Sequence, residues 1–148
     1  MQIINHDLVQ KSIEGYLLPQ LYTKAVGQLI LGTIAVESDF GRYHSQINPN
    51  YEGAKGITQI ERPTFNDLKA RYKDKYPKIK DIEWEDLAFD DMKAIVFCRL
   101  KYLSVKSPSP KENDIEGMAA YWKIFYNSIY GAGKVTDYIN KYNKYVKE

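Results

Sequence analysis

A chain of 148 residues is the usual length of a single domain, and it can bury a core without disulfides or metals. Its formal charge of +2, with no concentrated basic stretch, gives no support for a nucleic-acid partner. The longest apolar run is too short and too interrupted to span a bilayer, so we expect one domain over residues 1–148 and no membrane insertion.

Two helices are predicted in the first forty residues. Asn5 can cap the first, and Thr23 can cap the second, which runs to about Phe40. The second is apolar on most sides, which is typical of a helix at the centre of its domain. Gly27 and Gly32 lie inside it, where each glycine costs about 1 kcal/mol relative to alanine. We therefore expect a neighbouring element to pack closely against them.

An irregular segment follows over residues 41–60. Residues 48–50, Asn-Pro-Asn, predict a turn, and the residues around Ile57 and Gln59 could form a short strand or an extended piece. The fold class predicted here is therefore mostly α, with a short irregular or β excursion after the second helix.

The second half of the chain is predicted to be helical. Pro63 lies at the start of a third helix and Pro77 ends it. Another helix follows Trp84, and Asp114 and Thr136 can cap the last two. Prolines and capping residues thus divide this half into four helices.

The single cysteine, Cys98, lies in an apolar helical run, so we expect a buried and inert thiol. The two histidines, His6 and His44, form no ligand pattern with it, and the sequence contains no metal-binding motif. We expect neither a metal nor a cofactor. The N-terminus also lacks the basic start and apolar stretch of a secretory signal.

Three local motifs occur in a recognisable order. The first is Glu37-Ser38 at the end of the apolar helix, the second is GAKGITQI over 53–60, and the third is AAYWKIFYNSIYGAGKV over 119–135. Together they resemble the soluble lytic transglycosylase family of the lysozyme-like superfamily. That family has a Glu-Ser pair, then a Gly-Leu-Met-Gln type segment, then an Ala-Tyr-Asn type segment. The resemblance implies a lysozyme-like (α+β) domain that acts on the glycan strands of peptidoglycan.

The resemblance also implies roles for individual residues. Glu37 falls on the catalytic acid, and Thr58 stands where methionine is common. The third motif fits in two registers, with the tyrosine at either Tyr121 or Tyr126. The substrate-binding residues expected on this basis are Ser38, Gly56, Gln59, Tyr121, Tyr126 and Asn127.

A transglycosylase of this family uses one glutamate. By the resemblance, Glu37 protonates the oxygen between MurNAc and GlcNAc, and the MurNAc 6-hydroxyl then attacks to give a 1,6-anhydro sugar without water or a metal. Such an acid must hold its proton near the working pH. The apolar run 25–36 and the negative end of the helix dipole both act to raise the pKa of a carboxyl at position 37.

Two other interpretations remain open. A hydrolytic muramidase would need a second carboxylate facing Glu37, and the candidates are Asp39, Glu52 and Glu61. The second interpretation is a non-catalytic protein that binds glycan or forms a structural part of a virion. With a single domain and no visible signal peptide, we expect a bacteriophage protein, virion-associated or lytic, with other virion proteins as candidate partners.

Overall fold

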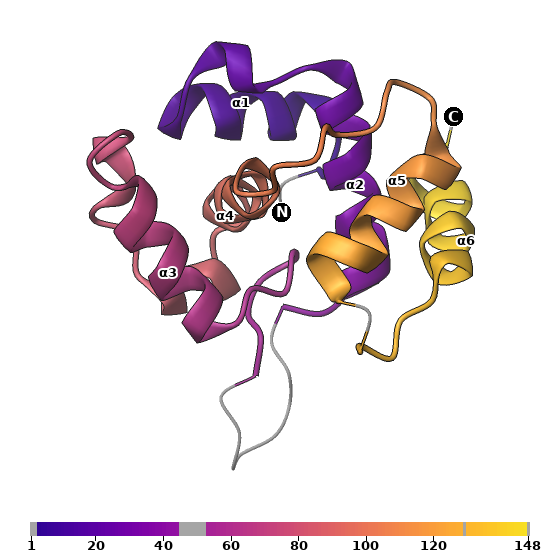
Figure 1. Ribbon diagram of the computed structural model, residues 1–148. Helices are drawn as coiled ribbons and strands as arrows, with labels where there is room; N and C mark the ends of the chain where they lie inside the picture. Colours follow the sequence, from indigo (N-terminus) through magenta and orange to yellow (C-terminus); the bar gives the residue numbers. More distant parts are fainter. Residues whose placement is uncertain (1–2, 45–52, 129, 148) are drawn as a thin grey trace.

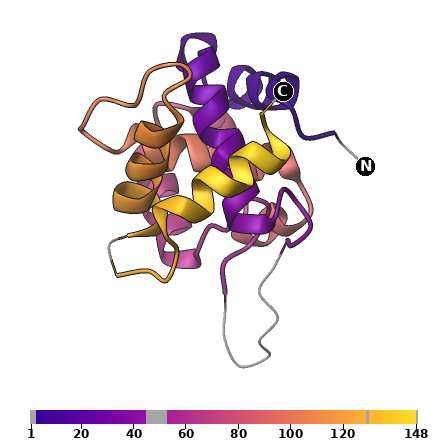
Figure 2. The same ribbon diagram turned by 90° about the vertical axis from the view of Figure 1, so that its right-hand side faces the viewer.

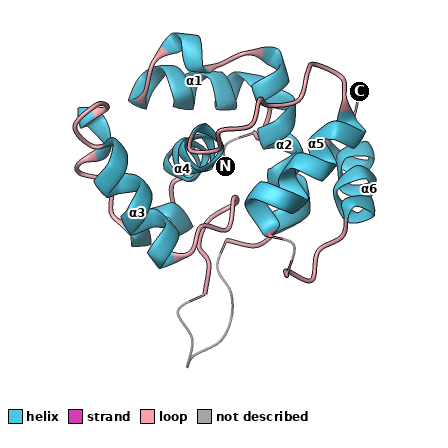
Figure 3. Cartoon of the chain, viewed as in Figure 1, coloured by secondary structure: helices cyan, strands magenta, loops and turns pink. Residues whose placement is uncertain are grey.

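The computed structural model describes residues 3–44, 53–128 and 130–147, and in these it is mostly helical (Figures 1 and 3). The helices are α1 (His6–Tyr16), α2 (Lys24–Ser38), α3 (Arg62–Tyr72), α4 (Asp91–Leu103), α5 (Ile115–Trp122) and α6 (Val135–Tyr145). Short 3₁₀ turns span Pro19–Leu21, Pro77–Ile79 and Trp84–Ala88, and a π turn, Lys123–Asn127, continues α5. The helical class predicted from the sequence is confirmed.

The predicted excursion after α2 is irregular rather than β in the residues described. Its one pairing there is an isolated antiparallel bridge between Lys55 and Ile60. The turn predicted at 48–50 lies outside the described residues.

Helix α2 lies at the centre of the molecule, as its sequence predicts. Eleven of its 15 residues are buried, and α1, α4, α5 and α6 all contact it. Figure 2 shows α6 crossing it on one side. A helix that is apolar on most of its circumference is stable only when other elements cover it. None of the described helices is long and apolar enough to cross a membrane.

Three of the predicted helix caps are confirmed. The Asn5 side chain accepts a hydrogen bond from the Leu8 amide at 2.9 Å, and Thr23 accepts one from Val26 at 3.1 Å. The Asp114 carboxylate accepts a hydrogen bond from the Gly117 amide at 3.0 Å. Each cap satisfies an amide that has no partner inside its helix.

Four helix boundaries differ from prediction. Helix α3 ends at Tyr72, before Pro77, because residues 73–75 turn out of the helix. Helix α2 ends at Ser38 rather than Phe40, because Asp39 and Phe40 have left-handed φ values of 51° and 58°. Helix α6 starts before Thr136, because the Asp137 carboxylate accepts the Lys134 amide at 2.8 Å. The helix expected after Trp84 is a 3₁₀ turn followed by α4, which Asp90 caps.

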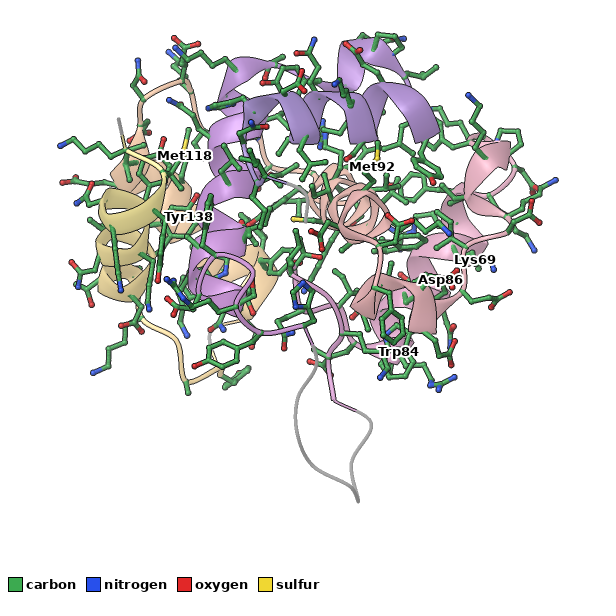
Figure 4. All side chains as sticks on the ribbon, turned by 180° about the vertical axis from the view of Figure 1, so that it is seen from behind. Lys69, Trp84, Asp86, Met92, Met118 and Tyr138 are labelled. Carbon is green, nitrogen blue, oxygen red and sulfur yellow. The ribbon has the colours of Figure 1, made fainter. Side chains whose placement is uncertain are left out.

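The two glycines inside α2 permit close packing, as expected. A Cβ atom on Gly32 would lie 2.1 Å from the hydroxyl of Tyr138, and one on Gly27 would lie 2.6 Å from Nδ1 of His6. Tyr138 comes from α6 and points toward α2 (Figure 4), where its hydroxyl donates to the Leu29 carbonyl at 3.0 Å. Glycine therefore lets α6 and α2 approach each other.

Cys98 is fully buried in α4. Burial raises the pKa of its thiol to about 12, so the reactive thiolate does not form near neutral pH. The expectation of a buried, inert cysteine is confirmed.

Candidate functional site

Glu37 lies in the last turn of α2 and is half-buried. The indole Nε1 of Trp122 donates a hydrogen bond to its Oε2 atom at 2.9 Å. Trp122 is itself 1% exposed, so tight packing holds this donor in place. No described residue donates a hydrogen bond to the other carboxyl oxygen, Oε1.

The surroundings of Glu37 raise the pKa of its carboxyl, and burial is the largest cause. The hydrogen bond from Trp122 and the charge of Lys101 lower this pKa, while the charge of Glu61 raises it. The net effect is a carboxyl that keeps its proton to a higher pH than an exposed glutamate does. This is the property that a general acid needs.

Lys101, on α4, is a second charged group near Glu37. Its Nζ donates to the Tyr126 carbonyl at 2.8 Å and lies 3.9 Å from the centroid of the Tyr126 ring. Burial lowers the pKa of Lys101, and the charge of Glu37 raises it. Sequence reasoning missed both Lys101 and Trp122, although Trp122 stands within the third motif.

The second motif forms a tight turn over residues 55–60. Gly56 has φ +84°, and a Cβ atom there would lie 2.4 Å from the Leu87 carbonyl oxygen. Its amide also donates to the His44 carbonyl. Gln59, with φ 52°, uses its Nε2 to donate to the Gly56 carbonyl at 2.9 Å. Gly56 is thus a backbone requirement of the turn, and the amide nitrogen of Gln59 stabilises it.

Thr58 joins this turn to the rest of the site. Its hydroxyl donates to the Ala94 carbonyl of α4 at 2.8 Å, and its own carbonyl accepts the Tyr126 hydroxyl at 2.6 Å. The second and third motifs therefore meet at the bond between Tyr126 and Thr58, and Tyr126 also contacts Lys101. Of the two candidate tyrosines, Tyr126 is the one that contacts the second motif.

Tyr121 faces a different part of the molecule. Its hydroxyl donates to the Ser107 carbonyl at 2.8 Å, and its ring stacks on Tyr102 with centroids 5.8 Å apart. It lines a cavity between α2, α4 and α5. The structure therefore does not bring Tyr121 to Glu37.

Asn127 and Ser38 satisfy local hydrogen bonds. The Oδ1 atom of Asn127 accepts from Lys123 at 2.8 Å. The buried Ser38 hydroxyl donates to the Ile34 carbonyl and accepts the Gly41 amide, both at 2.9 Å. Neither residue bonds to the carboxyl of Glu37 in the described part of the chain.

The candidate second carboxylates differ in their positions. Asp39 accepts hydrogen bonds from Lys141 at 2.6 Å and Tyr145 at 2.7 Å, which lower the pKa of Asp39 and hold it against α6. Glu61 is exposed at the start of α3, and its charge raises the pKa of Glu37. Glu52 lies outside the described residues. Glu61 is therefore the described candidate that acts electrostatically on Glu37.

No family model matches the chain, and no curated protein or solved structure is significantly similar to it. A functional assignment must therefore come from the residues around Glu37. Their arrangement is a half-buried acid with one fixed hydrogen-bond donor, a half-buried lysine nearby, and a tight turn that Tyr126 links to that lysine.

Proposed function

We propose that this protein is a peptidoglycan lytic transglycosylase with a lysozyme-like fold, in which Glu37 is the acid and then the base. One observation carries the proposal: the Glu37 carboxyl is half-buried with a raised pKa, and the Trp122 indole holds one of its two oxygens. The other oxygen, Oε1, is available for proton transfer. The substrate class comes from the resemblance of the three motifs.

Glu37 performs two proton transfers in this reaction. The protonated carboxyl first gives its proton to the glycosidic oxygen between MurNAc and GlcNAc, and the bond from that oxygen to C1 of MurNAc breaks. The MurNAc 6-hydroxyl oxygen then bonds to C1 and releases its proton to the Glu37 carboxylate. The products are a 1,6-anhydro-MurNAc end and a free GlcNAc hydroxyl, and Glu37 is protonated again.

The neighbours of Glu37 suit a group that must both give and regain a proton. Burial favours the protonated carboxyl, which acts first. The Trp122 N–H and the charge of Lys101 stabilise the carboxylate that remains after the first transfer. These effects oppose each other, and burial, the largest of them, leaves the pKa of Glu37 raised.

The test is mass spectrometry of the fragments released when the purified protein is incubated with bacterial sacculi. We expect 1,6-anhydro-MurNAc ends from the wild-type protein. Glu37→Gln should lower the cleavage rate by about 10²–10⁴-fold, the usual contribution of a general acid. Glu112→Gln, at an exposed loop carboxylate, is the matched control and should cleave like the wild type. Folded wild-type protein that releases no fragment would refute the proposal and favour a non-catalytic wall-binding or virion structural role.

A hydrolytic muramidase is the second candidate, and the electrostatic effect of Glu61 on Glu37 favours it. In that reaction a second carboxylate activates water or attacks the sugar. Reducing MurNAc ends, lost in Glu61→Gln, would establish it. Anhydro ends that persist in Glu61→Gln would exclude Glu61 from the chemistry.

Cleavage of glycan strands would place the action of this protein at the bacterial cell wall. A virion-associated or lysis enzyme of a bacteriophage is the setting that we propose, with peptidoglycan as the partner.

A further inference from the structure

A cavity of about 130 Å³ lies between α2, α4, α5 and the loop before α5. Figure 1 shows α2 between α4, near the centre of the view, and α5, to its right. One wall is aliphatic and comes mainly from Val26, Leu29 and Ile30 of α2 with Leu103 of α4. Arg99 of α4, with Ser107 and Ser109 of the loop, also lines it, so the cavity combines an aliphatic wall with polar groups and one cation.

Arg99 is partly buried and has one hydrogen bond, from its Nε to the Leu21 carbonyl at 2.9 Å. A guanidinium has five N–H donors, so the donors on its two terminal nitrogens remain. In the described part of the chain no carboxylate forms an ion pair with it.

The groups that act electrostatically on Arg99 include no carboxylate. They are the thiol of Cys98 and the phenols of Tyr121, Tyr76 and Tyr72. Burial lowers the pKa of Arg99, which reflects the cost of keeping this charge away from water. A partly buried cation is stabilised when an anion pairs with it, and the cavity provides space for one.

We propose that this cavity binds a small carboxylate with a branched aliphatic body, paired through its two oxygens to Arg99. The planar guanidinium matches a carboxylate in a two-bond arrangement, and such bonds are stronger than neutral ones. The cavity is slightly smaller than an apolar cavity of about 150 Å³ that takes up benzene. A branched acid of four or five carbons fits both the volume and the Val, Leu and Ile walls.

The site is separate from the chemistry proposed at Glu37. None of Glu37, Trp122, Lys101 and Glu61 lines the cavity. Binding there can therefore be measured whether or not the protein cleaves glycan, and failure of one proposal leaves the other standing.

The probe is isobutyrate, titrated at neutral pH and constant ionic strength into protein with labelled Ile, Leu and Val methyl groups. We expect saturable NMR shifts at the methyls of Val26, Leu29 and Leu103. Isobutyramide has the same shape without the charge, and inorganic phosphate has charge without the apolar body, so both should bind at least tenfold more weakly. Equal binding of isobutyramide, shifts confined to other residues, or no saturable shift would overturn the proposal.

Two variants test the charge of Arg99 and the empty volume of the cavity separately. Arg99→Gln should weaken isobutyrate binding at least tenfold, and Val105→Phe should weaken it by filling the cavity while keeping the cation. Arg71→Gln is the matched control, because Arg71 is an exposed arginine on α3 away from the cavity. If Arg99→Gln does not fold, the comparison of the three ligands on the wild-type protein decides the question by itself. Unchanged binding in a folded Arg99→Gln or Val105→Phe variant would also refute the proposal.

Discussion

The contact between Gly32 and Tyr138 gives the sharpest prediction about stability. A Cβ atom at Gly32 would lie 2.1 Å from the Tyr138 hydroxyl oxygen and 2.3 Å from the ring carbon that bears it. Tyr138 has no exposed surface, so its ring has no open space to move into. Gly32→Ala must therefore displace the ring or shift α6 away from α2.

The expected magnitude follows from three contributions. Overpacking a dense core costs about 1–3 kcal/mol. Breaking the buried hydrogen bond from Tyr138 to the Leu29 carbonyl, 3.0 Å long, costs about another 1–3 kcal/mol. Alanine recovers about 1 kcal/mol of helix propensity. We expect Gly32→Ala to lower the free energy of unfolding by about 1–5 kcal/mol.

The same substitution at Gly15 is the matched control. Apart from its two chain neighbours and the backbone of its own helix, no heavy atom would lie within 4 Å of a Cβ atom at that position in α1. Gly15→Ala should therefore raise the free energy of unfolding, by up to about 1 kcal/mol. The assay is urea denaturation followed by tryptophan fluorescence, with midpoints compared at equal slope. If Gly32→Ala is as stable as the wild type or more stable, the inferred packing of α6 on α2 is wrong.

Three further predictions concern the site. The pKa of Glu37 in the folded state is raised above its ordinary value of 4.5. The folded state therefore binds this proton more tightly than the unfolded state does. The stability of the wild-type protein should fall as the pH rises from the unfolded-state pKa through the folded-state pKa of Glu37. Glu37→Gln should lack this fall in denaturation at a series of pH values; parallel curves would contradict it. Trp122→Phe removes a hydrogen bond that lowers the pKa of Glu37. The pH above which glycan cleavage is lost should therefore be higher in this variant than in the wild type. A lower pH would refute the role given to Trp122. Tyr126→Phe leaves the buried Thr58 carbonyl without its donor and should cost about 1–3 kcal/mol of stability; an unchanged denaturation midpoint would show that this bond contributes nothing.

The sequence alone was enough to predict the central helix and the position of Glu37 at its end. The apolar run of α2 leaves that helix no stable place except the core, and Thr23 marks where it starts. These signals are local, because capping bonds and helical periodicity join residues three or four positions apart. The caps at Asn5 and Asp114 were predictable for the same reason.

Which side chains surround Glu37 was decided only by the tertiary structure. Trp122 is 85 positions from Glu37 along the chain, and the motif by itself left two tyrosine registers open. Asp39, two residues from Glu37, is held against α6 by Lys141, 102 positions away. Glu61, which directly precedes α3, and Lys101 of α4 act on the Glu37 carboxyl. These neighbours cannot be predicted from sequence spacing, because only the packing of the helices around α2 brings them together.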